Sequence, residues 1–448
     1  MVNAVEQDIR LSDKFNYRKL LRYTIPSIIM MVFTSIYYVV DGFFVSNFAG
    51  KTSFAAINFI IPVILILGSI GFMFGTGSGA LIAKTMGEGD KKKANEVFSL
   101  IVYFSIFVSV ILSVIGLFII KPVALLMGAE GELLRQSVIY GSILLIALPS
   151  YVLQYEFQCL FSSAEKPKLG LFVTILAGVV NIVFDALFIV VFKWGLIGAA
   201  TATLLGQLVG GIFPVIYFSR NNPSLLKLGK FKLDFKAIYK TCINGSSELL
   251  SNVAMSLVGL IYNYQLYKYA LENGIASYGV LMYVSMFFQA VFFGYTVGVA
   301  PIISYKFGEE KHEEVKGLLV KNMVMIGIFS LSMFVISTLL AKPVTYLFVG
   351  YDQELINMTI HAFSIFNFSF LFSGFTIMIS SYFTALNDGF TSMLVTFLRA
   401  LVFQISTIII LPIYWQLEGV WMALVLSELL SVIAAFIILI SKKTTNQN

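Results

Sequence analysis

Long apolar runs are the feature that most restricts how this chain of 448 residues can fold. Hydrophobic residues make up 58% of the sequence and charged residues only 12%, which is about half the charge of a typical soluble domain. So few charges cannot cover the surface of a globular protein of this length, and so many apolar residues exclude a disordered chain. The sequence therefore predicts a protein whose chain crosses a membrane many times.

A membrane-spanning helix needs about 20 mainly apolar residues. Windows of that length predict an all-α polytopic protein with twelve transmembrane helices. The runs are too long for the strands of a membrane barrel, which alternate in polarity over about 10 residues. The spans are expected near residues 17–46, 54–83, 94–120, 133–161, 168–192, 195–218, 237–266, 274–305, 315–340, 354–385, 390–414 and 419–440.

The segments that join the spans differ sharply in basic residues. If the N-terminus is cytoplasmic, 24 of the 30 lysines and arginines fall on the cytoplasmic side. Such an excess marks the cytoplasmic face, where basic side chains meet anionic lipid, so the high pI needs no nucleic acid partner. We expect a multi-pass protein of the plasma (inner) membrane with cytoplasmic N- and C-termini.

A repeat with an offset of 221 residues relates the two parts of the chain. The paired positions are Gly77 with Gly298, Gly87 with Gly308, Glu88 with Glu309, and Lys121-Pro122-Val123 with Lys342-Pro343-Val344. We expect two pseudo-symmetric six-helix lobes, residues 1–221 and 222–448, in a monomeric protein. Each lobe has an even number of spans, so both lobes have the same orientation and the substrate path is expected between them.

Acidic side chains inside spans are costly and are functional candidates by default. Five lie well inside: Asp41, Glu156, Asp185, Glu248 and Glu428. Asp41 lies roughly 8 Å and Asp185 roughly 10 Å from the outer ends of their helices, at 1.5 Å of rise per residue. These two acids therefore share one level in the outer part of the first lobe.

Polar residues are expected at the same level. Tyr37 precedes Asp41 by one turn, Asn181 precedes Asp185 by one turn, and Thr203 lies at similar depth in the sixth span. This oxygen-rich group suits a proton shared between two carboxyls or a Na⁺ ion, and the sequence does not choose between H⁺ and Na⁺. The alternative is that each residue packs separately within the bundle.

The remaining ionisable residues have simpler interpretations. Glu156 is near Lys166 and Lys168 and could form a structural pair at the inner interface. Glu428 and Arg399 are expected to form an ion pair within the bundle. His361 is interpreted as a packing histidine. The two histidines and two cysteines form no metal-ligand pattern, so we expect no cofactor other than the coupling ion.

Pro26 and an aromatic run are further candidates. Pro26 interrupts the first span about four turns before Asp41, where it produces either a static kink or a hinge. The run MYVSMFFQAVFFGY at 282–295 either contacts lipid or lines a cavity for flat ligands. The candidate substrate or gate residues are Glu248, Tyr283, Phe287 and Gln289.

The order and spacing of several short motifs resemble the multidrug and toxic compound extrusion (MATE) family, in its DinF/MepA-like branch. The motifs are Pro26, Tyr37-x-x-x-Asp41, Ala164-Glu165-Lys166-Pro167-Lys168, Asn181-x-x-x-Asp185, Gly198-Ala199-Ala200-Thr201-Ala202-Thr203 with Gln207, Gly298-x-x-Pro301 and Tyr305-x-Phe307-Gly308. The resemblance covers essentially the whole chain. In another prokaryotic branch of the family, the seventh span carries a deeper acid. This chain has Ser256 close to that position, and its Glu248 lies about two turns earlier.

The resemblance implies a V-shaped pair of lobes that exports organic, often cationic and aromatic compounds in exchange for H⁺ or Na⁺ by alternating access. It also implies that Asp41, Asn181, Asp185 and Thr203 couple the cation, with Tyr37 nearby, and that the first span bends at Pro26.

Three other functions fit the sequence less well. A lipid or lipid-linked oligosaccharide flippase of the same superfamily would need several deep basic residues, and only Arg399 qualifies. A major-facilitator carrier would need a Gly-x-x-x-Asp-Arg type loop after the second span, and GEGDKKKANE does not fit. An intramembrane enzyme would need a catalytic His or Ser group, which His312 and His361 do not supply, so we expect no enzymatic activity.

Overall fold

All regular structure in residues 9–445, which the computed structural model describes, is helical. The side chains of residue 51 and of residues 443–445 are not described. The elements are α1 (Tyr17–Phe44), η1 (Val45–Ala49), α2 (Lys51–Gly68), α3 (Ile70–Gly87), α4 (Lys91–Leu126), α5 (Gly131–Ser163), α6 (Pro167–Asp185), η2 (Ala186–Val191), α7 (Gly195–Ser219), α8 (Phe235–Gly308), α9 (His312–Val349), α10 (Gln353–Phe366), η3 (Asn367–Ser369), α11 (Phe370–Ala385), α12 (Gly389–Phe397), η4 (Leu398–Phe403) and α13 (Gln404–Thr445). The predicted all-α polytopic fold is confirmed.

Ten of the helical segments in the described part of the chain are long and apolar enough to cross a membrane. Two of them are too long for one crossing: α8 has 74 residues and would be roughly 110 Å long if straight, against a hydrocarbon core of about 30 Å. The backbone is non-helical at Leu271 in α8 and at Gln416 in α13. Dividing each of these two segments at its non-helical residue gives the twelve predicted spans. The count of twelve therefore depends on that division.

The 221-residue repeat extends to the conformation of the turns. Residues with positive φ recur at offsets of 221 to 223: Gly50 with Leu271, Gly89 with Glu310, Glu165 with Asn387, and Lys193 with Gln416. Gly50 adopts φ 92° without a side chain, whereas Leu271 adopts φ 50° and ψ −141° with one. That region of backbone space is strained for any residue with a Cβ atom.

Leu271→Gly is therefore expected to be more stable than Leu271→Ala by about 1 kcal/mol, because both variants remove the exposed side chain but only glycine relieves the backbone. Apparent melting temperatures of the purified variants in detergent measure this difference. Gly50→Ala, at the equivalent turn, should lower the melting temperature. A Leu271→Ala protein at least as stable as Leu271→Gly would contradict the assignment of strain.

Several helices begin at polar caps that fix the ends of the bundle. The side chains of Asn16, Asp90, Asp234 and Asp388 accept hydrogen bonds from backbone N–H groups in the first turns of α1, α4, α8 and α12. These groups have no partner within the helix, so the caps stabilise the start of each helix. Asp352 caps α10 in the same way.

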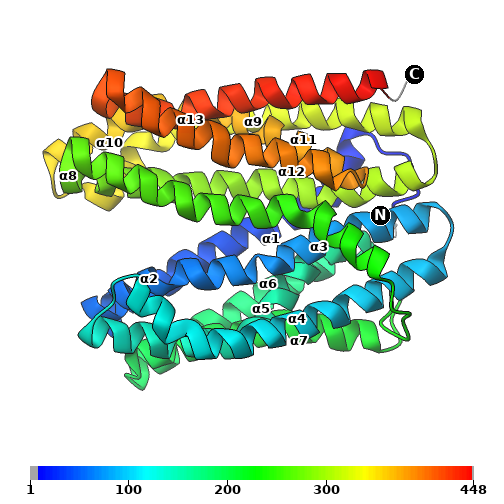
Figure 1. Cartoon of the computed structure of the whole chain (residues 1–448), viewed down its shortest axis with the longest axis horizontal. Helices are drawn as coiled ribbons and strands as arrows, with labels where there is room; N and C mark the ends of the chain where they lie inside the picture. Colours follow the sequence, from blue (N-terminus) through cyan, green and yellow to red (C-terminus); the bar gives the residue numbers. More distant parts are fainter. Residues whose placement is uncertain (1–8, 446–448) are drawn as a thin grey trace, which may run out of the picture.

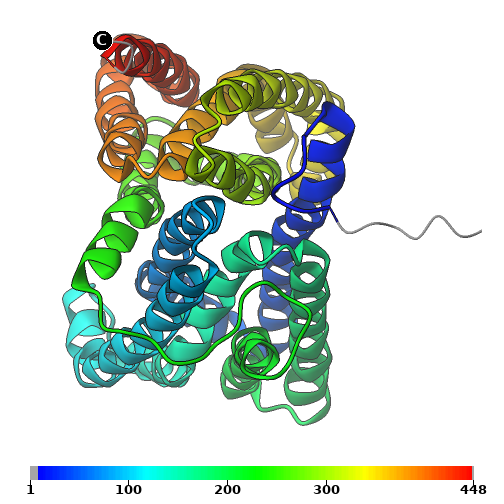
Figure 2. The ribbon, with the colours of Figure 1, turned by 90° about the vertical axis from the view of Figure 1, so that its right-hand side faces the viewer.

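We call α1–α7 the first half and α8–α13 the second half. Figure 1 shows the first half below and the second above, and Figure 2 shows the linker before α8 passing across one end of the first half. The halves meet where α8 packs against α1 and α3. A Cβ atom at Gly87 would overlap the Tyr305 carbonyl oxygen, and one at Gly308 would overlap that of Lys84. Small residues thus let the two backbones approach closely.

The segment before α1 crosses the same end of the molecule and contacts both halves. Leu11 N–H donates to the Glu165 carboxylate at 2.6 Å in the first half. In the second half, Lys306 Nζ donates to the Ser12 carbonyl at 2.8 Å and Lys321 Nζ to the Phe15 carbonyl at 2.8 Å. Residues 1–8 and 446–448 lie outside the described residues, so the predicted cytoplasmic position of the chain ends stays a prediction.

Candidate functional site

Two acidic side chains from different helices meet inside the first half. Asp41 lies in the last turn of α1, and Asp185 ends α6 where the backbone becomes the π-helical segment η2. Asp41 is 7% exposed and Asp185 is 0% exposed. Their carboxyls lie close enough for each to influence the ionisation of the other. The structure therefore brings together the two acids that are predicted to lie at the same depth.

The three predicted companions lie on the helices around this pair. Tyr37 is buried one turn before Asp41, and its ring stacks on Tyr38 with centroids 4.6 Å apart. Asn181 is 2% exposed, one turn before Asp185. The Thr203 hydroxyl in α7 donates to the Ala199 carbonyl at 3.0 Å, which leaves its oxygen lone pairs free to accept.

Two residues of α5 complete the site and are not among those predicted from the sequence. Tyr140 is 1% exposed, interacts with Thr203 and lies within electrostatic reach of both acids. Gln154 is 3% exposed and interacts with Tyr37. Tyr140 lies 7 residues from the outer end of its predicted span, so the depth argument that grouped the two acids could have found it.

Buried polar atoms without a hydrogen-bond partner are concentrated here. They include Asp41 Oδ1, both carboxylate oxygens of Asp185, both amide atoms of Asn181, Gln154 Oε1 and Gln207 Oε1. Buried polar groups are nearly always hydrogen-bonded, so each exception needs an explanation. Carboxylate, amide and hydroxyl oxygens are ligands for a hard cation, and two adjacent carboxyls can also share a proton. The described residues contain no group of three His, Cys, Asp or Glu suited to a metal ion.

Pro26 is buried in α1, which continues as one helix on both sides of it. The α8 backbone packs closely against this part of α1, because Gly298 faces Thr24 and Gly294 faces Ile28. Pro26 therefore lies between two contacts with the second half. Its predicted role as a hinge stays a prediction.

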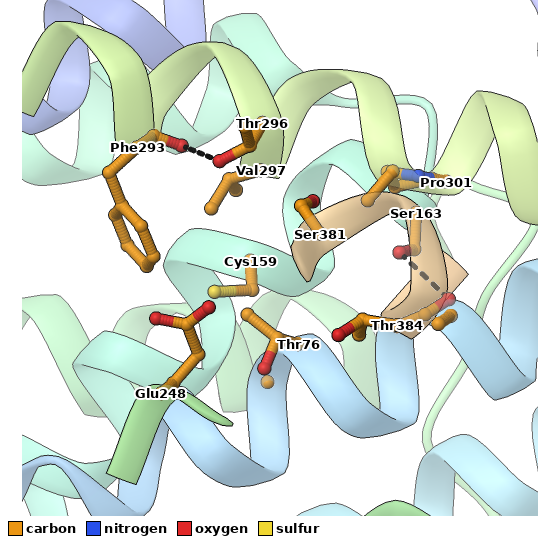
Figure 3. Close-up of a pocket in the computed structure, with 14 residues that line it drawn as sticks. Thr76, Cys159, Ser163, Glu248, Phe293, Thr296, Val297, Pro301, Ser381 and Thr384 are labelled. Carbon is orange, nitrogen blue, oxygen red and sulfur yellow. Dashed lines mark hydrogen bonds between the residues drawn. The ribbon is translucent and has the colours of Figure 1, made fainter. Parts of the chain in front are cut away.

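A small cavity lies between the halves. Its walls come from α3, α5, α8 and α11, and Figure 3 shows the Glu248 carboxylate beside Cys159 and below the ring of Phe293. The other three candidate substrate or gate residues do not line this cavity. Tyr283 is 43% exposed and stacks on Phe348 of α9, while Phe287 and Gln289 are partly buried elsewhere along α8.

The other ionisable residues separate into one confirmed prediction and two corrections. Arg399 and Glu428 form the predicted ion pair, with Nη2 and Oε1 2.9 Å apart. Glu156 is fully buried and accepts a hydrogen bond from Ser105 of α4 in place of the predicted structural pair. The interpretation of His361 as a packing residue is wrong, because it is exposed and its Nε2 lies 2.7 Å from Oε1 of Glu418.

These features define a polytopic α-helical membrane protein with a buried acidic pair. The chain belongs to the MatE family, whose profile matches residues 26–187 and 249–410. The resemblance found in the sequence is thereby confirmed.

Relatives and solved structures agree with this assignment. The multidrug export protein MepA of Staphylococcus saprophyticus is 24% identical over 426 residues, covering 94% of this chain and 93% of that protein. MepA of Staphylococcus aureus is 24% identical over 429 residues, with the same coverage. A crystal structure of MATE in complex with MaL6 superposes with a TM-score of 0.93 at 23% identity, covering 99% of this chain and 100% of that one. The outward-facing conformation of a multidrug resistance MATE family transporter has a TM-score of 0.92 at 23% identity, covering 100% of both chains.

Proposed function

We propose that this protein is a multidrug exporter: a cation-coupled antiporter that exchanges H⁺ or Na⁺ for organic, often cationic and aromatic compounds. One observation carries the proposal, namely the meeting of Asp41 and Asp185 in the buried interior of the first half. The relatives named multidrug export protein support the substrate class.

The physical argument starts from the cost of burying charge. Two adjacent carboxylates in a poorly solvated site repel each other and lack counterions, so a bound proton or Na⁺ stabilises the pair. Asp41, Asn181, Asp185 and Thr203 supply the oxygens for that cation, with Tyr37 beside them. Release of the cation restores the repulsion between the two carboxylates. The empty site therefore favours a different conformation from the cation-bound site.

The coupling site is connected to the interface between the halves through α1. This helix carries Asp41 near one end, and around Pro26 it contacts Gly294 and Gly298 of α8. A bend at Pro26 that depends on the charge of the acidic pair would change these contacts. That link between cation binding and the relative position of the halves is the basis for alternating access.

Two lobes, residues 1–221 and 222–448, move relative to each other in this proposal. The twofold match of the family profile and the recurrence of the turns support this division. The protein acts as a monomer in the plasma membrane with both termini in the cytoplasm, which the distribution of basic residues supports. A flippase is less well supported, because the 14 residues that line the cavity include no lysine or arginine.

Proteoliposomes test the coupling directly. Ethidium transport should require either a pH gradient or a Na⁺ gradient, each imposed separately at tenfold, and should stop when an ionophore collapses the effective gradient. The gradient that drives transport identifies the coupling ion. Transport that proceeds at the same rate without any ion gradient would contradict the proposal.

A further inference from the structure

The linker between the two halves, residues 220–234, is fixed to the first half along only part of its length. It crosses one end of that half (Figure 2). The backbone N–H of Lys227 donates to Asn95 Oδ1 of α4 at 2.6 Å, and the N–H of Gly229 donates to Ser99 Oγ at 3.0 Å. The linker is therefore held against the start of α4 as far as Gly229.

Beyond Gly229 the linker exposes apolar side chains that alternate with lysines. The sequence is Lys230-Phe231-Lys232-Leu233, and all four side chains are exposed. Phe231 is 43% exposed and Leu233 is 63% exposed. Large apolar side chains gathered on a surface mark a site of contact with a membrane or a partner.

The first turns of α8 continue this pattern as two neighbouring rows. Phe235 and Tyr239, one helical turn apart, are 73% and 67% exposed. Lys236 and Lys240 are exposed in the adjacent row, again one turn apart. Aromatic side chains are enriched at the boundary between membrane and water, where lysines extend their charged ends toward the headgroups. The start of α8 thus has the composition of an interfacial segment.

The linker also joins the surface of α4 that is expected to face lipid. The ring of Phe231 packs against Tyr103 of α4 with centroids 5.5 Å apart. Tyr103 begins a row of exposed apolar side chains at helical spacing, which continues through Phe107, Val110, Val114 and Phe118. In a membrane-spanning helix such a row contacts acyl chains, so Phe231 lies where the lipid-facing surface of α4 meets the linker.

Positive charge in this region has no internal partner. Residues 220–240 contain six basic residues and one acidic residue, Asp234. The Asp234 carboxylate accepts hydrogen bonds from the backbone N–H groups of Lys236 and Ala237, so it serves as the cap of α8. Within the described part of the chain, no ion pair or side-chain hydrogen bond is formed by Lys230, Lys232, Lys236 or Lys240. The four ammonium groups are therefore available to an external anion.

We propose that residues 230–240 form an interfacial binding site for anionic phospholipid. The four lysines bind the phosphate groups, and the four exposed apolar side chains enter the boundary between headgroups and acyl chains. In the proposed orientation this end faces the cytoplasm, and the cytoplasmic leaflet carries anionic lipid that attracts clustered lysines. The site goes beyond the export function, because it involves neither the coupling cation nor the exported compound.

A tryptophan introduced by Phe231→Trp reports on the lipids in contact with the linker. The full-length protein is reconstituted into vesicles of equal parts phosphatidylcholine and phosphatidylglycerol, with brominated acyl chains on one lipid or the other. Bromine quenches tryptophan fluorescence on contact, and the signal of the unmodified protein is subtracted. We expect brominated phosphatidylglycerol to quench the introduced tryptophan at least twice as strongly as brominated phosphatidylcholine. Equal quenching by both lipids, or none by either, would overturn the proposal.

Charge variants in the Phe231→Trp protein test the role of the lysines. Changing all four to glutamine should abolish the preference for phosphatidylglycerol, whereas changing all four to arginine should preserve it. Lys311→Gln with Lys316→Gln is the matched control, because these lysines lie outside the site and are paired with Glu309 and Glu313. The control should retain the preference. A preference that survives the four glutamine substitutions would overturn the assignment.

These results are separable from the coupling proposal, since fluorescence quenching needs no ion gradient and no exported compound. Asp41→Asn and Asp185→Asn should keep the lipid preference. If these two variants also export at the unmodified rate, the coupling proposal fails and the lipid site stands. If they lose export while the introduced tryptophan shows no lipid preference in any variant, the lipid site fails and the coupling proposal stands.

Discussion

Replacing Asp41 or Asp185 by asparagine is expected to reduce ethidium efflux at least tenfold in a pump-deficient bacterium that expresses the protein. Asparagine keeps the size of aspartate but cannot bind and release a proton, and it provides a weaker ligand for Na⁺. The loss should appear in the efflux rate at equal amounts of protein in the membrane, which immunoblotting measures.

The double variant provides a sharper form of this prediction. Because the two carboxyls are expected to act as one unit, Asp41→Asn with Asp185→Asn should be no worse than either single variant. Two acids outside the site serve as controls. Glu418→Gln changes an exposed acid paired with His361, and Glu156→Gln changes a buried acid hydrogen-bonded to Ser105. Both controls should retain efflux, and single aspartate variants that export like the unmodified protein would disprove the coupling role.

The helices could be predicted because the bilayer imposes their length. About 20 apolar residues are needed for each crossing, so the position of every span follows from local sequence alone. The turn at Leu271 illustrates the limit of this reasoning. The chain turns there between two helical stretches of α8, and the residue with the non-helical backbone is a leucine. Composition therefore predicts the spans but not which residue adopts the turn conformation.

The acidic pair could be predicted because depth along a helix is a local quantity. Counting residues from the helix ends brought Asp41 and Asp185 to one level, and i, i+4 spacing added Tyr37 and Asn181. Which faces of α1, α5 and α6 point toward each other depends on packing across the bundle, which depth does not reveal. Gln154 illustrates this, since its place beside Tyr37 is set by the packing of α5 against its neighbours.

Partners between distant helices were predicted only where charge required them. Arg399 and Glu428 were paired correctly because a buried charge needs its opposite. Glu156 instead accepts a hydrogen bond from the hydroxyl of Ser105. Hydroxyl side chains are too common in this sequence for such a partner to be predicted. His361 was assigned to the interior because histidine in an apolar segment usually packs, but its segment of α10 presents it at the surface beside Glu418.

The largest effect on stability is expected from breaking the Arg399–Glu428 pair. Glu428 is 2% and Arg399 is 16% exposed, and three hydrogen bonds join them. Arg399→Met leaves a carboxylate buried without its partner, which typically costs about 3–5 kcal/mol. The purified variant should therefore have a much lower apparent melting temperature in detergent than the unmodified protein.

The double variant Arg399→Met with Glu428→Leu should recover most of that loss, because it replaces both charges by apolar groups of similar volume. The recovery separates the cost of an unpaired charge from the loss of packing, which both proteins share at position 399. An Arg399→Met protein as stable as the unmodified one would show that Glu428 is neutral or solvated in the native state. A double variant no better than Arg399→Met would assign the loss to packing and would contradict the ionic origin of the effect.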